Sequence, residues 1–311
     1  MTARAETSGY APALPGEATV RDYFSLLKPG VMALVVFTGF IGMAMAPGHL
    51  HPFLKAVTVL CIALGSGAGA AINMWYDRDI DSLMRRTQRR PLPTGRIAPE
   101  DALFLGLFLA VASVGLLGLA VGWIAAGLLA FAIWFYAYVY TMALKRRTPQ
   151  NIVIGGAAGA FPPVIGWLAV SPHFSWDPAF YFLITFFWTP PHFWALALFR
   201  HEDYIAAKIP MLPVTSGRRV TQYHILCYSL ALVVISLLPA MAGISGPLYG
   251  VTAFLLGAYF VALAWRLLAH DTPKHAIALF KYSILYLFLI FSMLLIDKIV
   301  DRMVFFPLFG G

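Results

Sequence analysis

The chain has 311 residues, of which 60% are hydrophobic and only 12% are charged. A soluble domain is normally about half apolar and about a quarter charged, so this composition excludes a soluble globular protein and predicts surface that faces lipid. Basic loops beside a membrane explain the formal net charge of +8 more simply than nucleic-acid binding does. Cys61 and Cys227 lie in apolar runs and support neither a disulfide framework nor a cysteine-based metal site.

The predicted elements are all helical. Residues 1–20 are polar and rich in small residues, so we expect a disordered cytoplasmic tail there, and no cleavable signal peptide, before a single transmembrane domain over 21–311. Apolar runs of about 20 residues then predict an all-α polytopic membrane protein, because that length of helix crosses the hydrocarbon core. Nine transmembrane helices are expected, at 27–46, 54–76, 101–120, 123–144, 151–170, 178–200, 222–242, 246–269 and 277–299. These runs lack a two-residue alternation, so a barrel is not expected.

The basic residues predict the orientation of these helices. Of the 22 Lys and Arg residues, only Lys55, Lys298 and Arg302 fall on the side of the membrane opposite to the tail. The positive-inside rule therefore places the N-terminus in the cytoplasm and the C-terminus on the outer side. We expect the membrane to be a bacterial inner membrane, in which the outer side is the periplasm. The long polar loops at 77–100 and 200–221 lie on the cytoplasmic side, where we expect the functional site.

The most informative local pattern is Asn73, Asp77 and Asp81, which are spaced four residues apart and so share one face of a helix. Carboxylates on one face repel each other, and their position at the end of a membrane helix adds to that cost. A divalent cation would relieve both costs, and ligands that are all oxygen suit magnesium bound to a substrate phosphate. The alternative is a solvated helix end with Arg78 as a partner.

A basic stretch follows this carboxylate face. It contains Arg86 and Arg90. Further basic residues follow at Lys145 and Arg146, and another, Lys28, precedes the first helix. Arginine makes bidentate contacts with phosphate and lysine acts as a point charge, so these five residues are candidate ligands of a diphosphate. The alternative is that these charges only set the membrane topology.

His192 follows two prolines inside the run 178–200. Backbone broken by proline at membrane depth is tolerated where it faces protein or a cavity, and an ionisable residue at that depth is a candidate functional residue. The alternative is a histidine that is hydrogen-bonded across helices. Aromatic residues at 134–140 and 186–188 are expected mostly to pack or to lie at the membrane interface, and some could line an isoprenoid tunnel.

Several of these strings resemble a known family. The motif Asn73-x3-Asp77-x3-Asp81 resembles the first Asp-rich motif of the UbiA superfamily of intramembrane prenyltransferases. Over residues 20–300, further strings are similar to the branch of that superfamily that farnesylates protoheme IX. They are residues 27–29, 73–81, 90–96, 145–156, 189–194 and 203–213. The first motif is specific to the superfamily, and the combination is specific to the branch.

The resemblance implies a UbiA-like fold with nine helices around a central cavity that is capped on the cytoplasmic side. It implies magnesium as the cofactor, held by Asn73, Asp77 and Asp81 as the catalytic residues. It also implies farnesyl diphosphate and heme B as substrates. The farnesyl group would join the 2-vinyl group of heme B with addition of water, and the product, heme O, would serve terminal oxidases directly or as heme A. Heme A synthase and oxidase assembly proteins are then candidate partners.

The chain departs from the superfamily at one point. Members that act on aromatic acids carry a second Asp-rich motif, whose aspartates would fall near His192 and Phe199, and here only Glu202 and Asp203 remain nearby. We interpret this as a pocket rebuilt for a porphyrin and formed by His192, Trp194 and Asp203, with His192 near the iron or a propionate.

Two other functions remain open at this stage. A secondary transporter with carboxylate ion sites would also combine broken helices with membrane charges. However, the carboxylates of this chain lie at one membrane edge beside a basic loop, which favours a diphosphate site. Prenylation of a quinone precursor is the second alternative, and the altered second motif is unfavourable for it.

Overall fold

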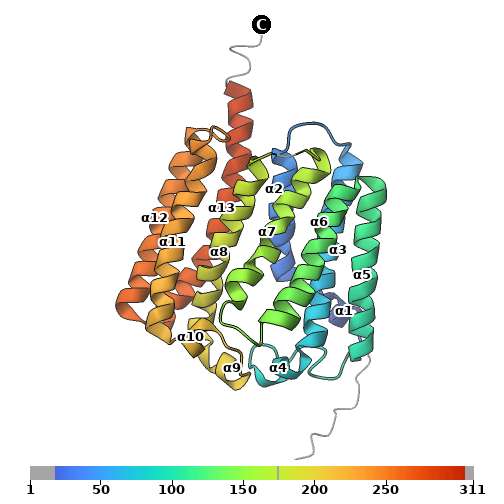
Figure 1. Ribbon diagram of the computed structural model, residues 1–311, viewed down its shortest axis with the longest axis vertical. Coiled ribbons are helices and arrows are strands. Elements are labelled where there is room, and N and C mark those ends of the chain that lie inside the picture. Colours follow the sequence, from blue (N-terminus) through green and yellow to red (C-terminus); the bar gives the residue numbers. More distant parts are fainter. Residues whose placement is uncertain (1–17, 174, 305–311) are drawn as a thin grey trace, which may run out of the picture.

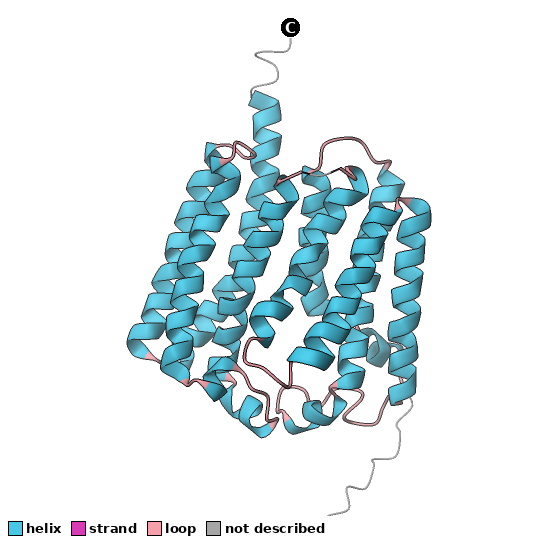
Figure 2. Ribbon diagram, viewed as in Figure 1, coloured by secondary structure: helices cyan, strands magenta, loops and turns pink. Residues whose placement is uncertain are grey.

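The computed structural model describes residues 18–173 and 175–304, and within them every regular element is a helix (Figure 2). The helices are α1 Val20–Leu26, α2 Pro29–Met45, α3 Pro52–Tyr76, α4 Arg78–Leu83, α5 Pro99–Ala120, α6 Trp123–Trp134, η1 Phe135–Leu144, α7 Asn151–Val170, α8 Asp177–Phe199, α9 His201–Ala206, α10 Leu212–Thr215, α11 Arg218–Met241, α12 Pro247–His270 and α13 Pro273–Val304. The predicted tail falls outside these residues except for 18–20, where Thr19 caps α1.

The long helices run side by side as one bundle, with the short helices α4, α9 and α10 together at one end, called the α4 end below (Figure 1). Within the described residues, eight helices are long and apolar enough to cross a membrane, and the bent pair α1 and α2 makes a ninth. The prediction of nine spans in an all-helical membrane protein is therefore confirmed. The last span is longer than predicted, because α13 begins at Pro273 and continues to Val304.

The first span is broken where the sequence carries Lys28 before Pro29. A proline ring disfavours the α-helical conformation of the residue before it, and Lys28 adopts a left-handed backbone instead (φ 53°, ψ 59°). The two helices therefore meet at an angle of 53°. A left-handed conformation is costly for a residue with a side chain, and it is typical of functional sites. Here it turns the Lys28 side chain towards the end of α3.

Close backbone approach holds α2 against α7. A Cβ added to Gly166 would lie 2.0 Å from the carbonyl oxygen of Gly39, and one added to Gly42 would lie 2.0 Å from the carbonyl oxygen of Pro163. Small residues allow the backbones of membrane helices to approach this closely. Such close packing matters because lipid supplies no hydrophobic force to hold the helices together. The largest apolar cluster joins α8, α11, α12 and α13 and also takes in residues of α2 and α7.

The predicted helix at 123–144 is continuous, but its second half, η1, is a π-helix. The backbone N–H of Lys145 therefore bonds to the carbonyl of Tyr140, five residues earlier. The hydroxyl of Thr141 similarly donates to the carbonyl of Tyr136 (2.8 Å). π-Helical segments are rare and concentrate at functional sites. This one changes the direction in which Thr141 and Lys145 leave the helix.

Candidate active site

The residues of the carboxylate motif lie at the α4 end. Asn73, Asp77 and Asp81 are 3%, 0% and 3% exposed. The helix breaks at Asp77, which ends α3 and precedes α4, but the bonds Asp77 N–H to Asn73 O (2.9 Å) and Asp81 N–H to Asp77 O (2.8 Å) continue across the break. The three residues thus keep helical spacing. The alternative of a solvated helix end does not hold, because the carboxylates are buried and Arg78 bonds to the carbonyl of Trp75.

Asn73 is the centre of the hydrogen-bond network at this site. Its Oδ1 accepts a bond from Lys28 Nζ (2.6 Å), while its Nδ2 donates to Asp77 Oδ2 (2.9 Å) and Thr141 Oγ1 (3.0 Å). Lys28, predicted only as a candidate diphosphate ligand, thus lies against Asn73. Thr141 was missed by the sequence analysis, because an isolated threonine in an apolar run carries no signal and the π-helix that places it was not predicted.

Three of the predicted cations pair with the buried carboxylates. Lys145 forms an ion pair with Asp77, and Arg90 Nη1 lies 2.6 Å from Asp81 Oδ2. Arg146 lies farther from Asp77, with Nη2 3.5 Å from Oδ1. Residues from five separate segments (the α1–α2 break, the end of α3, α4, the loop after α4 and the end of η1) therefore converge on one buried charged cluster.

Asp79 and Arg86 lie at the exposed rim of this cluster. Arg146 makes two bonds of 2.7 Å to the carboxylate of Asp79. Burial is the largest single influence and raises the pKa of Asp79, but the hydrogen bonds and charge of Arg146, together with backbone hydrogen bonds, hold that pKa below its usual range. The Arg86 side chain is exposed and makes no hydrogen bond or ion pair with another described residue. It is therefore free to contact a ligand.

The donor set at this end fits a magnesium ion that is shared with a substrate. No group of three His, Cys, Asp or Glu among the described residues is arranged to hold a metal alone. Magnesium, however, is usually bound by one or two carboxylates together with substrate phosphates and water. Asp77 Oδ1 and Asp203 Oδ2 are buried oxygens without a hydrogen-bond donor. Asp203 is tied to the loop after α4, since its Oδ1 accepts a bond from the N–H of Arg85 (3.3 Å).

His192 lies in α8, seven residues before the end of that helix and so about 10 Å from it along the axis. Its ring is stacked between Trp188 (centroid distance 4.3 Å) and Phe280 of α13 (4.7 Å). Its Nδ1 lies 2.6 Å from Oγ of Ser283, also on α13. The histidine is thus hydrogen-bonded across helices, while its Nε2 makes no bond to another described residue.

Trp194 lies on a different side of α8 from His192. Its ring is 2% exposed and packs edge-on against His224 and Tyr228 of α11. The structure therefore does not bring Trp194 and His192 together, since two residues that are two positions apart lie on nearly opposite sides of a helix. Trp194 contributes to the packing of α8 on α11.

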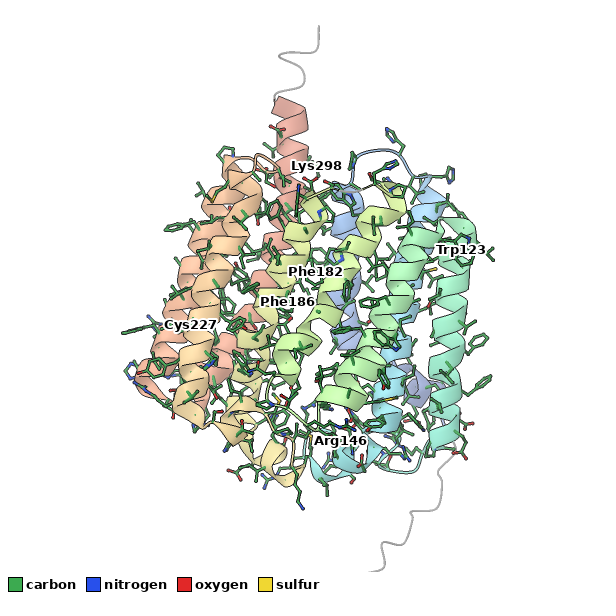
Figure 3. The ribbon with its side chains drawn as sticks, in the orientation of Figure 1. Trp123, Arg146, Phe182, Phe186, Cys227 and Lys298 are labelled. Atoms are coloured by element: carbon green, nitrogen blue, oxygen red, sulfur yellow. The ribbon has the colours of Figure 1, made fainter. Side chains whose placement is uncertain are left out.

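The aromatic residues at the end of α6 and in η1 divide between the two sides of this continuous helix. Trp134 and Tyr138 are about half exposed and stack on each other, as expected for residues that face lipid. Tyr136 and Tyr140 stack with centroids 5.5 Å apart and face the bundle, where Tyr140 packs over Gly155. In α8, Phe182 and Phe186 stack on each other and lie in the half of the helix that is farther from the α4 end (Figure 3).

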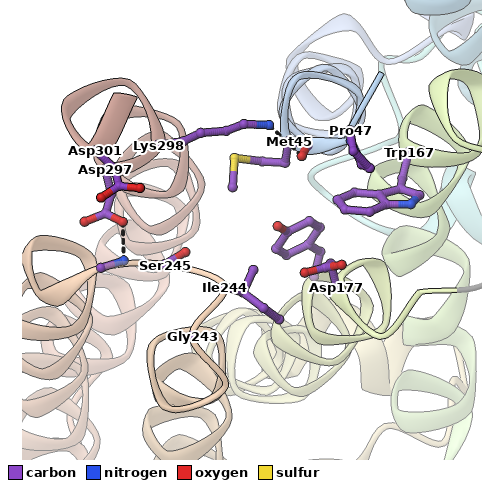
Figure 4. Close-up of a pocket in the computed structure, with 12 residues that line it drawn as sticks. Met45, Pro47, Trp167, Asp177, Gly243, Ile244, Ser245, Asp297, Lys298 and Asp301 are labelled. Carbon is purple, nitrogen blue, oxygen red and sulfur yellow. Dashed lines mark hydrogen bonds between the residues drawn. The ribbon is translucent and has the colours of Figure 1, made fainter. Parts of the chain in front are cut away.

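A separate pocket of about 380 Å³ lies at the end of the bundle opposite to the carboxylate cluster. Figure 3 shows Lys298, which lines it, and Arg146 at opposite ends of the bundle. Figure 4 shows Asp297 on α13, bonded to the backbone N–H of Gly246, where it caps α12. Lys298 donates to the carbonyls of Ala44 (3.0 Å) and Met45 (2.7 Å) at the end of α2. These bonds tie α13 to α2 and α12.

A model of the UbiA prenyltransferase family matches residues 35–291, which is most of the chain. The chain belongs to the UbiA prenyltransferase family. Among its relatives, the protoheme IX farnesyltransferase of Brucella ovis is 53% identical over 291 residues, which cover 92% of this chain and 93% of the relative. The protein of the same name from Rhizobium leguminosarum bv. trifolii is 54% identical over 289 residues, or 92% of each chain.

Solved UbiA structures share the fold. A structure described for digeranylgeranylglyceryl phosphate synthase aligns with a TM-score of 0.75 at 18% identity and covers 90% of this chain and 98% of that chain. A UbiA homolog from Archaeoglobus fulgidus, bound to DMAPP and Mg²⁺, aligns with a TM-score of 0.62 at 18% identity and covers 87% and 99%. The predicted UbiA-like fold is therefore confirmed.

Proposed function

We propose that this UbiA family member transfers the farnesyl group of farnesyl diphosphate to the 2-vinyl group of heme B, with addition of water, to give heme O. The observation that carries the proposal is the buried cluster of Asn73, Asp77 and Asp81 with its surrounding cations, at the edge of a membrane bundle. Relatives that are more than half identical over nearly the whole chain are named protoheme IX farnesyltransferase, which supports heme as the acceptor.

The cations of the cluster receive the diphosphate. Lys28, Arg90 and Lys145 already lie against Asn73 and the two buried carboxylates, and Arg86 and Arg146 lie at the exposed rim. In the free protein the internal ion pairs balance these buried charges. A diphosphate that enters the cluster replaces the carboxylates as partner of the cations, and charge-assisted bonds to phosphate are the strong kind.

Asn73, Asp77 and Asp81 would hold magnesium against that diphosphate, and Asp203 offers a further carboxylate oxygen from α9. When bound, magnesium supplies positive charge that neutralises the diphosphate as a leaving group. The buried position of Asp77 and Asp81 strengthens every electrostatic contact in the cluster, because little water competes for the charges. Thr141 fixes the Asn73 amide so that its Oδ1 stays directed at Lys28.

The reaction balances without a redox partner. The bond between the farnesyl C1 and the diphosphate oxygen breaks, and its electron pair leaves with the diphosphate. The terminal carbon of the vinyl group then bonds to the allylic cation, and the new cation beside the porphyrin ring takes up water and releases a proton. The protein must keep water from the first cation, and aromatic rings that face the bundle, such as Tyr136 and Tyr140, can stabilise it.

The acceptor would lie deeper in the bundle than the diphosphate. His192 is on the same helix that leads to Asp203, about two turns further into the membrane. Phe193, next to His192, packs with an apolar cluster that includes residues of α4, α7 and α9 at the α4 end, so this part of α8 connects the two regions. We assign His192 and Asp203 to the acceptor side, with Asp203 at its border with the metal, and Trp194 to the support of α8.

The membrane placement completes the proposal. The α4 end carries the basic loops and would face the cytoplasm, with the N-terminus on the same side. The bundle would lie in a bacterial inner membrane, with the C-terminus in the periplasm. Farnesyl diphosphate would enter from the cytoplasm and its chain would extend among the helices. Heme A synthase or an oxidase assembly protein would take the product.

One incubation tests the function. Membranes that contain the protein are supplied with farnesyl diphosphate, magnesium and heme B, and the extracted heme is analysed by mass spectrometry. A mass increase of one farnesyl group plus one hydroxyl group is expected, because a proton leaves after water adds, and it should require all three additions. If no such product forms, while proteoliposomes show sodium- or proton-driven uptake, the chain is a transporter. If the farnesyl group is found on a quinone precursor instead, the acceptor assignment is wrong.

A further inference from the structure

The hydroxyl of Ser283 makes two contacts that together assign the tautomer of His192. Ser283 Oγ lies 2.7 Å from the carbonyl oxygen of Phe280, and a carbonyl can only accept. The single hydroxyl proton is therefore used in that bond. His192 Nδ1 lies 2.6 Å from the same Oγ, so Nδ1 carries a proton and donates it to Ser283. In the neutral ring, Nε2 is then left with its lone pair.

The ring is also held rigidly in place. Trp188 and Phe280 cover its two faces in near-parallel stacks, with interplanar angles of 19° and 24°. Trp188 Nε1 in turn donates to the backbone carbonyl of Ser283 (2.6 Å), which locks α8 to α13 at this level. The ring can therefore neither flip nor tilt without breaking contacts with both helices, and the direction of Nε2 is fixed by the fold.

We propose that His192 Nε2 is an axial ligand of the iron of the porphyrin acceptor, and that Ser283 is a positioning residue that holds His192 in the tautomer needed for this bond. A neutral imidazole binds iron through such a lone pair, and histidine ligands usually donate their other N–H to an oriented acceptor. Ionised propionates, by contrast, need a hydrogen-bond donor, which Nε2 is not in this tautomer. The inference rests on the proposed function, since it takes heme as the acceptor.

Axial ligation would hold the porphyrin acceptor in position, as the charged cluster holds farnesyl diphosphate. One bond from His192 fixes the height of the porphyrin in the membrane, and rotation about that bond is all that remains to be restricted. The 2-vinyl group can then meet the farnesyl carbon in a defined orientation. Holding two substrates in their reacting geometry removes a large part of the free-energy barrier of a reaction between them. A metal-free porphyrin would lack this anchor.

The test is heme titration of purified protein, followed by absorption spectroscopy. The wild type should show the spectrum of histidine-ligated heme, and His192→Ala should lose it and regain it when imidazole is added. Ser283→Ala keeps the imidazole but should weaken heme binding by about 10- to 100-fold, as loss of an outer hydrogen bond to a metal ligand usually does. Ser283→Thr, which keeps a hydroxyl, should restore it.

Controls separate ligation from packing. Ser236 is a second buried serine that bonds across helices, to the hydroxyl of Tyr286 on α13 (2.8 Å), so Ser236→Ala should leave the heme spectrum unchanged. Binding of metal-free protoporphyrin IX should be equal in wild type, His192→Ala and Ser283→Ala. Retained binding of farnesyl diphosphate shows that each variant is folded. If His192→Ala does not fold, the Ser283 variants carry the test.

Three results would overturn the inference. The first is an unchanged heme spectrum in His192→Ala, and the second is a wild-type spectrum without histidine ligation. The third is an equal loss of heme and of metal-free porphyrin, which would indicate packing or a propionate contact. The mass assay on the wild type reports on the proposed function separately. If it yields farnesylated heme while any of these three results is found, the function stands and only the role of His192 fails.

Discussion

Replacing Asp77 with asparagine removes one charge from the centre of the site with little change in shape. Asp77 is completely buried, and its carboxylate pairs with Lys145 and lies 3.5 Å from Arg146. Loss of a hydrogen bond between charged groups costs about 1.5–3 kcal/mol of stability. The side chains of Lys145 and Arg146 are 16% and 30% exposed, so both cations can regain water and the lower value should apply. Asp77→Asn should therefore fold and insert.

The effect on turnover should be larger. An anionic oxygen that holds a metal against a leaving group contributes several kcal/mol of transition-state stabilisation. A loss of about 3 kcal/mol corresponds to a fall in kcat/KM of about two orders of magnitude, because each 1.36 kcal/mol is tenfold. The assay is the rate of farnesylated heme formation by purified protein at several magnesium concentrations, with thermal unfolding in detergent as the measure of stability.

Asp79→Asn is the matched control, since it removes a carboxylate two residues away. The Asp79 side chain is 61% exposed and pairs only with Arg146. An exposed ion pair is worth up to about 1 kcal/mol, so this variant should change kcat/KM at most about fivefold. Near-normal turnover of Asp77→Asn across the magnesium series, or an equal loss in Asp79→Asn, would show that the site was placed on the wrong carboxylate.

Three further predictions concern the cations, the π-helix and the helix packing. Lys145→Ala and Arg90→Ala should raise the KM for farnesyl diphosphate by about 10- to 100-fold, since each removes a charge-assisted hydrogen bond, and should leave heme binding intact. If correctly inserted variants have the same KM as the wild type, these residues only set the membrane topology. Thr141→Val removes the acceptor of one Asn73 bond and should lower kcat by up to about tenfold, with unchanged thermal unfolding; a fall in unfolding temperature instead would make Thr141 a structural residue. Gly166→Ala places a Cβ 2.0 Å from a backbone oxygen of α2 and should destabilise the protein by about 1–3 kcal/mol, seen as a lower unfolding temperature, whereas Gly159→Ala on the same helix, where a Cβ meets nothing within 4 Å, should not.

The number of spans and the position of the charged site could be read from the sequence because both are local properties. An apolar run of sufficient length must span the membrane as a helix, since its backbone polar groups find no other partner in lipid. The Asn73, Asp77 and Asp81 spacing survives the break at Asp77 because the bonds from each residue to the one four positions before it continue. The bend of the first span at Lys28 was not predicted, since a continuous helix was expected over 27–46, although its cause is also local: the proline at 29 restricts the backbone of Lys28.

The contacts between helices could be decided only by the tertiary structure. In a soluble protein an apolar stripe shows which side of a helix faces inward, but in a membrane the outer side is apolar too, so the sequence does not fix the rotation of each helix. For this reason Trp194 was grouped with His192 although it packs on α11, and Thr141 and Ser283 were missed. The π-helix that directs Thr141 and Lys145 at the site also depends on its neighbours, because its apolar sequence is compatible with an ordinary α-helix. The sequence by itself thus determined which residues carry charge and at which end of the bundle, and the packing of the helices determined which of them meet.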